Sequence, residues 1–253
     1  MNSASTASAT LACHVAKVSA VAKSTYRIEL KAPAGAHLPY RAGQYLQLEL
    51  TNHGSEPLPP LFYSIANNIN PKRPGQLELF IQNNSPLAIQ ILQQLARLSE
   101  TQKTVSVRLP LGNAFLQTDL HSSHLLVAAG SGIAKIKCIT EEILQQRPQT
   151  ELHIYWSNKQ REEFYLLDDF LALADQYENL RFTPILETPH NSWQGRTGYI
   201  YQVIEKDFDN LGGRQAYLCG SPQMVYGTID KLKAIGLSKE NCYSDVFEYA
   251  PRN

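Results

Sequence analysis

Residues 125–134, Leu-Leu-Val-Ala-Ala-Gly-Ser-Gly-Ile-Ala, decide the fold expected for the second half of the chain. An apolar run stops on Gly130-Ser131-Gly132, and a helix-forming stretch follows from Ile133. Such a turn leaves free backbone N–H groups at a helix N-terminus, where a nucleotide phosphate is stabilised. A Gly-x-Gly turn also serves as a plain connection between a strand and a helix, so this motif alone leaves both interpretations open.

Two other segments have a similar form. Residues 215–222, Gln-Ala-Tyr-Leu-Cys-Gly-Ser-Pro, predict a strand that ends on small residues and enters a helix. Ser221 is the expected N-cap of that helix and Pro222 its first residue. Residues 61–67, Leu-Phe-Tyr-Ser-Ile-Ala-Asn, place aromatic rings and a hydroxyl group at the end of another predicted strand.

The first half of the chain has the pattern of a small antiparallel β-barrel, because short β-rich runs are separated by Pro and Gly. One amphipathic helix is expected within it, over residues 86–98. The predicted strands are residues 14–19, 26–31, 45–50, 61–66, 76–82 and 104–109.

The second half alternates strands with helices, which favours a parallel sheet with crossover helices. The expected strands are residues 125–129, 151–157, 181–187, 215–219 and 242–247, and the helices are 134–146, 161–177, 198–206 and 222–234. The carboxyl ends of such strands share one ligand-binding cleft. We therefore predict a disordered tail (residues 1–10), a barrel domain (11–118) and an α/β domain (119–253).

Composition excludes several functions. Lys plus Arg and Asp plus Glu number 23 each, so no basic excess favours nucleic acid. No window approaches the roughly 20 apolar residues that span a bilayer. The four cysteines are widely scattered, which indicates a reducing, cytoplasmic setting and provides no iron–sulfur motif. The histidines lack metal-ligand spacing, so we expect no metal site.

The three segments, in this order, resemble those of the ferredoxin-NADP reductase superfamily. Residues 40–45 (Tyr-Arg-Ala-Gly-Gln-Tyr), 109–115 (Leu-Pro-Leu-Gly-Asn-Ala-Phe) and 154–156 (Ile-Tyr-Trp) are similar to its NAD(P)H:flavin oxidoreductase branch. The resemblance covers nearly the whole chain. It implies a flavin-binding barrel, an NAD(P)-binding α/β domain, and hydride transfer from NADH or NADPH to a flavin at the domain interface.

The resemblance also implies roles for single residues. Ser64 would hydrogen-bond flavin N5, while Cys219 and Asp245 would frame the nicotinamide as the remaining catalytic residues. Each has a structural alternative: a turn serine, a buried cysteine and a surface carboxylate. The residues expected to bind cofactors are Phe62, Tyr63, Ser64, Ile65, Gly112, Gly130, Ser131, Gly132, Ile133, Asn158, Lys159, Arg161, Cys219, Gly220, Ser221, Pro222 and Phe247.

The chain departs from the family pattern at Leu61, where an arginine would contact the flavin phosphate. Loss of such a charge-assisted bond, worth roughly 1.5–3 kcal/mol, favours a diffusible flavin (riboflavin, FMN or FAD) over a tightly bound one. Lys159 and Arg161 follow the second parallel strand and favour NADPH over NADH; the alternative is that they are surface charges at the start of a helix. Two alternatives stay open: a reductase with bound flavin that serves a protein or ferric acceptor, and a non-catalytic nucleotide-binding subunit.

Overall fold

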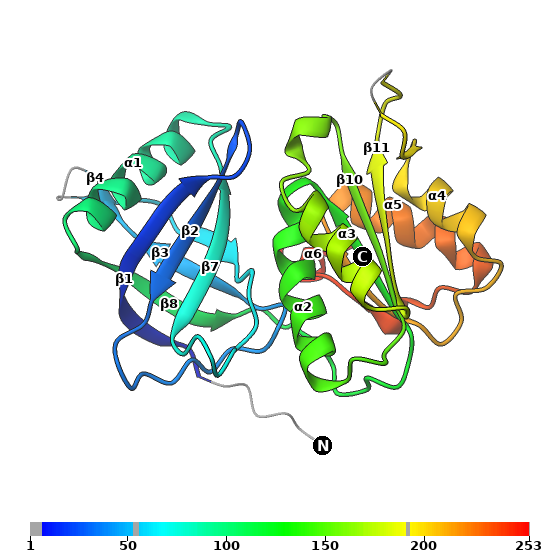
Figure 1. Cartoon of the computed structure of the whole chain (residues 1–253), viewed down its shortest axis with the longest axis horizontal. Coiled ribbons are helices and arrows are strands. Elements are labelled where there is room, and N and C mark those ends of the chain that lie inside the picture. Colours follow the sequence, from blue (N-terminus) through cyan, green and yellow to red (C-terminus); the bar gives the residue numbers. More distant parts are fainter. Residues whose placement is uncertain (1–6, 53–55, 191–192, 253) are drawn as a thin grey trace. The chain divides into compact units, whose positions relative to one another are not determined.

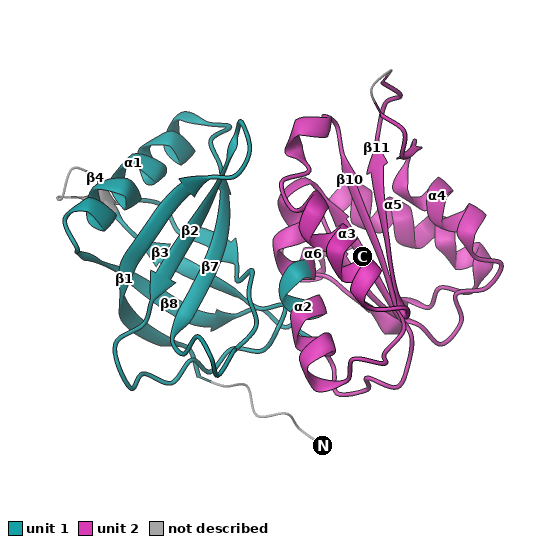
Figure 2. Cartoon of the chain, viewed as in Figure 1, with its two compact units in different colours: residues 1–116, 137–139 teal, residues 117–136, 140–253 magenta. Residues whose placement is uncertain are grey.

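A computed structural model describes residues 7–52, 56–190 and 193–252 of the chain (Figure 1). The chain divides into two compact units, residues 1–116 with 137–139 and residues 117–136 with 140–253 (Figure 2). The sequence placed this division between residues 118 and 119. Of the tail predicted over residues 1–10, residues 1–6 lie outside the described residues, and a strand already begins at Ala9.

The first unit is a six-stranded antiparallel sheet in the order β6-β3-β8-β1-β2-β7. The Ala66 amide, just after β6, donates to the carbonyl of Glu78 on β7 at 2.8 Å, so the sheet is nearly closed into the predicted barrel. Its strands are β1 (Ala9–Ala20), β2 (Thr25–Lys31), β3 (Tyr45–Glu49), β6 (Leu61–Ser64), β7 (Gln76–Gln82) and β8 (Thr104–Leu111), with a separate hairpin of β4 (Thr51–Asn52) and β5 (Glu56–Pro57).

One helix, α1 (Pro86–Glu100), covers part of this barrel. The Ser85 hydroxyl caps it by accepting from the Ala88 amide at 3.1 Å, and Pro86 begins it. The helix buries its apolar stripe, which includes Ile91 and Leu95, because these residues recur at helical spacing.

The second unit is the predicted parallel sheet, in the order β12-β11-β10-β9-β13-β14. Its strands are β9 (His124–Ala129), β10 (Leu152–Asn158), β11 (Leu180–Leu186), β12 (Arg196–Thr197), β13 (Gln215–Cys219) and β14 (Cys242–Tyr243). Its helices are α2 (Ile133–Gln146), α3 (Leu167–Gln176), α4 (Ile200–Asp207), α5 (Pro222–Leu232) and α6 (Val246–Tyr249), with short 3-10 turns at Gly130–Gly132, Arg161–Glu163, Lys233–Ile235 and Lys239–Asn241.

The parallel sheet is covered on both faces (Figure 1). Alternate residues of β9, such as Leu125 and Val127, belong to a core with residues of α4 and α5, such as Val203 and Ile229. The intervening residues of β9 face the other side, because side chains alternate along a strand. This two-sided burial explains why β9 is a continuous apolar run.

Three predicted elements differ from the observed ones by four or more residues at one end. The strand expected over residues 14–19 begins at Ala9. The helix expected over residues 161–177 begins only at Leu167, because the rings of Phe164 and Tyr165 pack edge-on against Trp156 at 5.0 and 5.4 Å. The last strand, expected over residues 242–247, ends at Tyr243 and gives way to α6.

The order of the parallel strands fixes where a ligand can bind. β9 lies between β10 and β13, so the chain leaves β9 toward one side and later returns on the other. Ligands of open α/β sheets bind at the carboxyl end of such a switch point. Here that end is the turn Gly130–Gly132.

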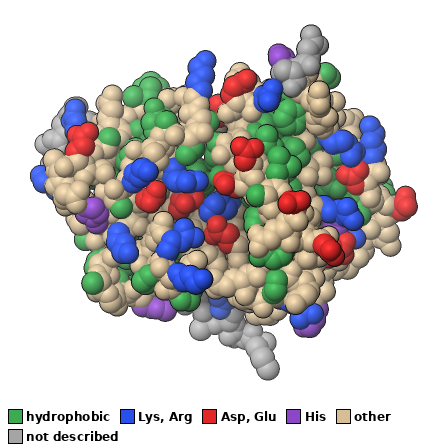
Figure 3. Space-filling model, in the orientation of Figure 1, with side chains coloured by type: hydrophobic (Ala, Val, Ile, Leu, Met, Phe, Trp, Pro, Cys, Tyr) green, Lys and Arg blue, Asp and Glu red, His purple; other side chains and the backbone are tan. Residues whose placement is uncertain are grey.

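Among the described residues, no helix has the length and apolar character needed to cross a membrane. On the face drawn in Figure 3, cationic and anionic side chains are interspersed, in keeping with the equal counts of the two signs.

Candidate functional site

In the first unit, Gln44 joins three segments that carry the family resemblance, residues 40–45, 61–67 and 109–115. Its side-chain amide donates to the Gly112 carbonyl at 2.9 Å, and its backbone carbonyl accepts from the Ile65 amide at 3.1 Å. Its Oε1 also accepts from the Arg41 amide at 2.8 Å. Residues 40–45, 61–67 and 109–115 therefore form one cluster at the end of β6.

Tight backbone geometry explains the glycines of this cluster. Gly43 and Gly112 have φ values of 98° and 88°, in the left-handed region that favours glycine. A Cβ on Gly43 would also lie 3.0 Å from the Ala114 carbonyl oxygen. The side chain of Arg41 lies over the Phe115 ring, with Cζ 4.6 Å from its centroid, and adds a cation to the cluster.

Strand register places the expected flavin residues on two faces of β6. Ser64 pairs with Tyr45, and Phe62 pairs with Gln47, so these four residues share a face. The ring of Phe62, 55% exposed, meets that of Tyr45 edge-on at 5.8 Å. Tyr63 lies on the opposite face of β6, where burial raises the pKa of its hydroxyl.

Leu61 shares the face of Tyr63 and is buried. An arginine at this position would have to leave that apolar environment, because a buried unpaired charge is strongly destabilised. The departure from the family pattern is thus accompanied by packing that suits leucine. Ile65, which follows Ser64, is also buried.

In the second unit, the two Gly-containing turns meet. A Cβ added to Gly132 would lie 2.3 Å from the carbonyl oxygen of Cys219, so only glycine permits this approach. Gly130 has a φ of 56°, and its carbonyl accepts from the indole Nε1 of Trp156 at 2.9 Å. Ser131 is exposed at the tip of the turn, while Ile133 is buried as the first residue of α2.

The second turn, after β13, has the predicted cap. The hydroxyl of Ser221 accepts from the Met224 amide at 3.2 Å, and Pro222 begins α5. Gly220 lies close to both turns, since an added Cβ would meet Met224 Cε of α5 and would lie 3.2 Å from Cβ of Ala129, which precedes the turn into α2. The backbone amides at the starts of α2 and α5 therefore lie at the same edge of the sheet.

Cys219 and Asp245 belong to one electrostatic cluster with Lys135, a residue that the sequence analysis missed. Burial raises the pKa of the Cys219 thiol to about 12; Lys135 opposes this shift and Asp245 adds to it. Lys135 Nζ donates to Asp245 Oδ2 at 2.8 Å. Asp245 is therefore half-buried in an ion pair and is not a solvated surface charge.

A cavity of about 520 Å³ lies beside these turns at the carboxyl edge of the sheet. Its walls include Ser157 and Lys159 after β10, Glu187 after β11, and Ser221. Tyr199 and Tyr201, stacked at 5.8 Å, also line it. This set combines an aromatic pair, hydroxyls, a cation and an acid, which are the groups that recognise an adenine nucleotide.

Three other expected residues lie apart from the lining of this cavity. Asn158 is buried, and its side chain donates to the Glu163 carbonyl at 3.4 Å, so it fixes the loop after β10. Arg161 is exposed in the following 3-10 turn. Phe247 is half-buried in α6, with its ring 5.8 Å from that of Tyr226.

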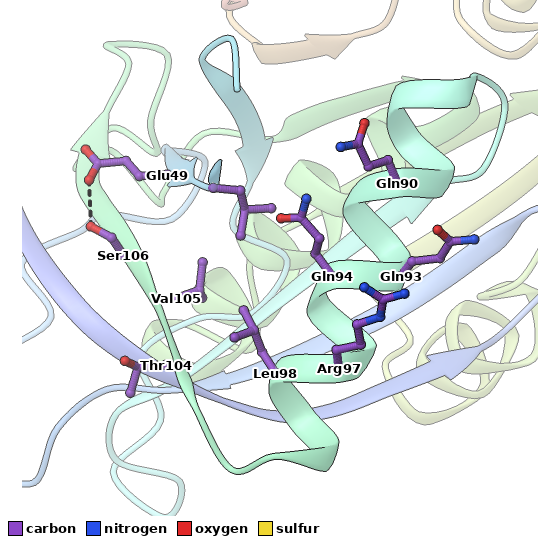
Figure 4. Close-up of a pocket in the computed structure, with 10 residues that line it drawn as sticks. Glu49, Gln90, Gln93, Gln94, Arg97, Leu98, Thr104, Val105 and Ser106 are labelled. Atoms are coloured by element: carbon purple, nitrogen blue, oxygen red, sulfur yellow. Dashed lines mark hydrogen bonds between the residues drawn. The ribbon is translucent and has the colours of Figure 1, made fainter. Parts of the chain in front are cut away.

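A second cavity, of about 560 Å³, lies in the first unit between α1 and strands β3 and β8 (Figure 4). Figure 4 shows Gln90, Gln94 and Leu98 on the helix and the Ser106 hydroxyl bonded to Glu49, at 2.6 Å. No residue that the sequence analysis assigned to flavin lines it.

Sequence reasoning missed Lys135 and the tyrosine pair, whereas it placed Glu187 at one of the strand ends that share the ligand-binding cleft. Lysine in an amphipathic helix normally predicts a solvated position. The tyrosines follow a short turn and carry no motif of their own. Only the fold brings the two tyrosines to the cavity.

Known proteins match both a part of this chain and nearly all of it. Residues 126–229 match the family described as oxidoreductase NAD-binding domain. The chain is 25% identical to the NAD(P)H-flavin reductase of Vibrio harveyi over 243 residues, which cover 95% of this chain and 99% of that protein.

Solved structures have the same fold. A cytochrome P450 reductase of Amycolatopsis matches with a TM-score of 0.81 and 24% identity, over 95% of this chain and 70% of that one. A ferredoxin NADP+ reductase of Neisseria gonorrhoeae matches with a TM-score of 0.71 and 18% identity, over 95% of this chain and 98% of that one. Together with the joined motifs of the barrel and the parallel sheet, these matches confirm the resemblance to the ferredoxin-NADP reductase superfamily: the chain is an oxidoreductase with that fold, and residues 126–229 match the oxidoreductase NAD-binding domain family.

Proposed function

We propose that this protein is an NAD(P)H-dependent flavin reductase, which transfers hydride from the nicotinamide to a flavin. The observation that carries this proposal is the contact of Gly132 with Cys219, which joins a phosphate-binding turn to the expected nicotinamide residue. A full-length relative named NAD(P)H-flavin reductase supports it. When bound, the flavin supplies the N5 atom that accepts hydride.

The barrel residues would orient the flavin ring. Ser64 offers a hydroxyl to N5, and the exposed ring of Phe62 on the same face of β6 offers an apolar surface to the isoalloxazine. Tyr63, on the opposite face of β6, and Gly112, in the neighbouring turn, are the other residues that we propose to contact the flavin. This arrangement aligns the acceptor, and alignment is the main contribution that hydride transfer requires of the protein.

In the second unit, the Gly130–Gly132 turn would hold the coenzyme pyrophosphate at the N-terminus of α2. Cys219 would lie against the nicotinamide as a neutral thiol, because burial raises its pKa to about 12. Ser157 and Lys159 in the adjoining cavity favour the 2′-phosphate of NADPH, while Glu187 would bind the ribose hydroxyls of NADH. We favour NADPH, because Lys159 supplies a cation and Ser157 a hydroxyl for its 2′-phosphate.

We further propose that the flavin is a diffusible substrate. Leu61 is buried where the family's arginine would contact a flavin phosphate, so recognition through the ring alone is expected. The likeness to a cytochrome P450 reductase favours a second candidate, a bound flavin that passes electrons to a protein acceptor. In that case Arg41 is the cation of the same cluster that could reach the flavin phosphate.

Oxidation of NADPH and NADH by the purified protein, with riboflavin, FMN or FAD added, tests both candidates. Turnover that requires added flavin and accepts riboflavin supports the diffusible substrate. Flavin that stays with the protein through gel filtration supports the second candidate. Absence of oxidation with every flavin, and of any bound flavin, contradicts both.

The location we propose is the cytoplasm. All four cysteines are buried thiols, in keeping with a reducing compartment.

A further inference from the structure

Lys135 is a buried cation in an unfavourable position. It is the third residue of α2 and only 1% exposed. The N-terminus of a helix carries partial positive charge, so a lysine there is disfavoured even at the surface. A buried ammonium also loses its hydration. Something at this position must compensate for both effects.

The compensating group is Asp245, which lies between β14 and α6. Its Oδ2 accepts from Lys135 Nζ at 2.8 Å. Its other oxygen, Oδ1, is buried and has no hydrogen-bond partner within the part of the chain that the structure describes. Buried acceptors in native proteins are nearly always paired, so an unpaired carboxylate oxygen at a candidate site indicates a missing donor.

The surroundings of the pair identify the kind of donor. Asp245 interacts with the Cys219 thiol, and Tyr249 and Glu248 are further titratable groups that face it. None of these three supplies a bond to Oδ1. The nicotinamide end of the coenzyme carries a carboxamide, whose N–H groups are neutral donors suited to a carboxylate.

We propose that Lys135 is a positioning residue for the coenzyme: it orients Asp245 so that Oδ1 accepts a hydrogen bond from the nicotinamide carboxamide beside Cys219. This inference rests on the proposed function. The pair has a purpose beyond packing, because a buried ion pair is often no more stabilising than apolar residues of the same size. Burial raises the pKa of Asp245, and the ammonium opposes that shift and keeps the carboxylate available as an acceptor.

The test compares two ligands, one with and one without the nicotinamide end of the coenzyme. Binding is measured without flavin, so that no turnover occurs. Dissociation constants of NADPH and of 2′,5′-ADP, which lacks the nicotinamide, are compared for the native protein, Lys135→Met and Asp245→Asn. We expect NADPH to bind Lys135→Met about tenfold more weakly, as for loss of one charge-supported hydrogen bond, and 2′,5′-ADP to bind unchanged. Lys135→Arg should restore most of the affinity for NADPH.

A matched control removes another ion pair of the same unit. Arg196 Nη1 contacts Asp207 Oδ1 at 2.9 Å and lines neither turn, so Arg196→Gln should leave both dissociation constants unchanged. Circular dichroism checks that each variant is folded. If Lys135→Met does not fold, Asp245→Asn is used in its place for the comparison of NADPH with 2′,5′-ADP.

Each remaining outcome contradicts the inference. Equal NADPH affinity in the native protein and both variants means that the pair does not position the nicotinamide. Parallel loss of NADPH and 2′,5′-ADP means that Lys135 serves the phosphates or the fold. If the native protein binds neither probe, the proposed function itself is wrong, and this inference falls with it.

Discussion

Gly132 approaches the backbone of Cys219 so closely that a Cβ on Gly132 would lie 2.3 Å from the Cys219 carbonyl oxygen and 2.8 Å from its carbonyl carbon. Cys219 ends β13, and Gly132 lies in the turn that follows the neighbouring parallel strand β9, at the switch point of the sheet. Their contact connects the two turns that form the candidate coenzyme site.

Gly132→Ala should therefore damage both stability and binding. The obstacle is backbone and cannot rotate away, so we expect a loss of about 1–3 kcal/mol in the free energy of unfolding, typical of overpacking. NADPH should also bind more weakly, because the turn must shift. Urea unfolding and a binding titration measure these effects.

Gly130→Ala is the matched control for that variant. Gly130 has a φ of 56°, but an added Cβ would meet nothing within 4 Å. Gly130→Ala should therefore lower the free energy of unfolding by only about 1 kcal/mol, the cost of a left-handed backbone conformation at alanine. A larger loss for Gly130→Ala than for Gly132→Ala would contradict the collision with Cys219.

The buried thiols predict a loss of stability at alkaline pH. Burial raises the pKa of Cys219 and Cys242 from 9.0 to about 12. Between these values the unfolded thiols lose protons that the folded thiols keep, so the free energy of unfolding falls as pH rises. Below about pH 9 this contribution is fully present.

Urea unfolding at several pH values above about 8 measures this decline. Cys219→Ser should make it shallower, because a hydroxyl does not titrate in this range. Iodoacetamide should modify the native thiols slowly and the unfolded thiols fast. Rapid alkylation of native Cys219 near neutral pH would show an ionised thiol and contradict the predicted environment.

Coenzyme preference should depend on two side chains of the same cavity, Lys159 and Glu187. Lys159→Ala should weaken NADPH about tenfold, corresponding to roughly 1.4 kcal/mol, and leave NADH nearly unchanged. Glu187→Gln should act oppositely, since it removes a carboxylate that repels the 2′-phosphate and binds ribose. The ratio of kcat/KM values for NADPH and NADH measures both effects.

Lys206→Ala is the control for Lys159→Ala. Lys206 is an exposed lysine on α4 that does not line the cavity. An equal change of the ratio in both variants would indicate a general effect of surface charge.

Ser64 and Phe62 share one face of β6 and should affect different kinetic constants. Ser64→Ala removes one hydrogen bond to the acceptor atom and should lower kcat about tenfold, the equivalent of roughly 1.4 kcal/mol. Phe62→Ala removes the exposed ring and should mainly raise KM for the flavin. Steady-state kinetics with riboflavin separates the two.

Ser106→Ala is a suitable control. Ser106 is another serine of the barrel; its hydroxyl donates to Glu49, and it lines the other cavity. Its kinetic constants should match those of the native protein. Unchanged kcat in Ser64→Ala would exclude the proposed contact with N5.

The sequence predicted most of the fold because its local signals agree with one another. β7 and β13 have the predicted bounds, and the continuous apolar run of β9 reflects burial on both faces of a parallel sheet. Gly132 was identified from its turn motif, and Gly43 and Gly112 from the family resemblance. The structure explains these glycines by a positive φ at Gly43 and Gly112 and by the close approach of Gly132 to Cys219. Predicted contacts of single residues with flavin or NADPH remain predictions.

Elements set by distant contacts were harder to predict. The helix α3 begins at Leu167, six residues later than predicted, because Phe164 and Tyr165 pack on Trp156. No periodicity within residues 161–177 shows that contact. The same holds for α6, which replaces the end of an expected strand.

Sequence by itself therefore determined the two-part architecture, the turns at the strand ends and the candidate residues within those turns, because each depends on neighbours in the chain. Only the tertiary structure decided which face of β6 carries Ser64, how Gly132 meets Cys219, and that Lys135 is buried against Asp245, 110 residues away. Strand register, burial and ion pairing depend on residues far apart in the chain, and the order of the strands alone brings them together.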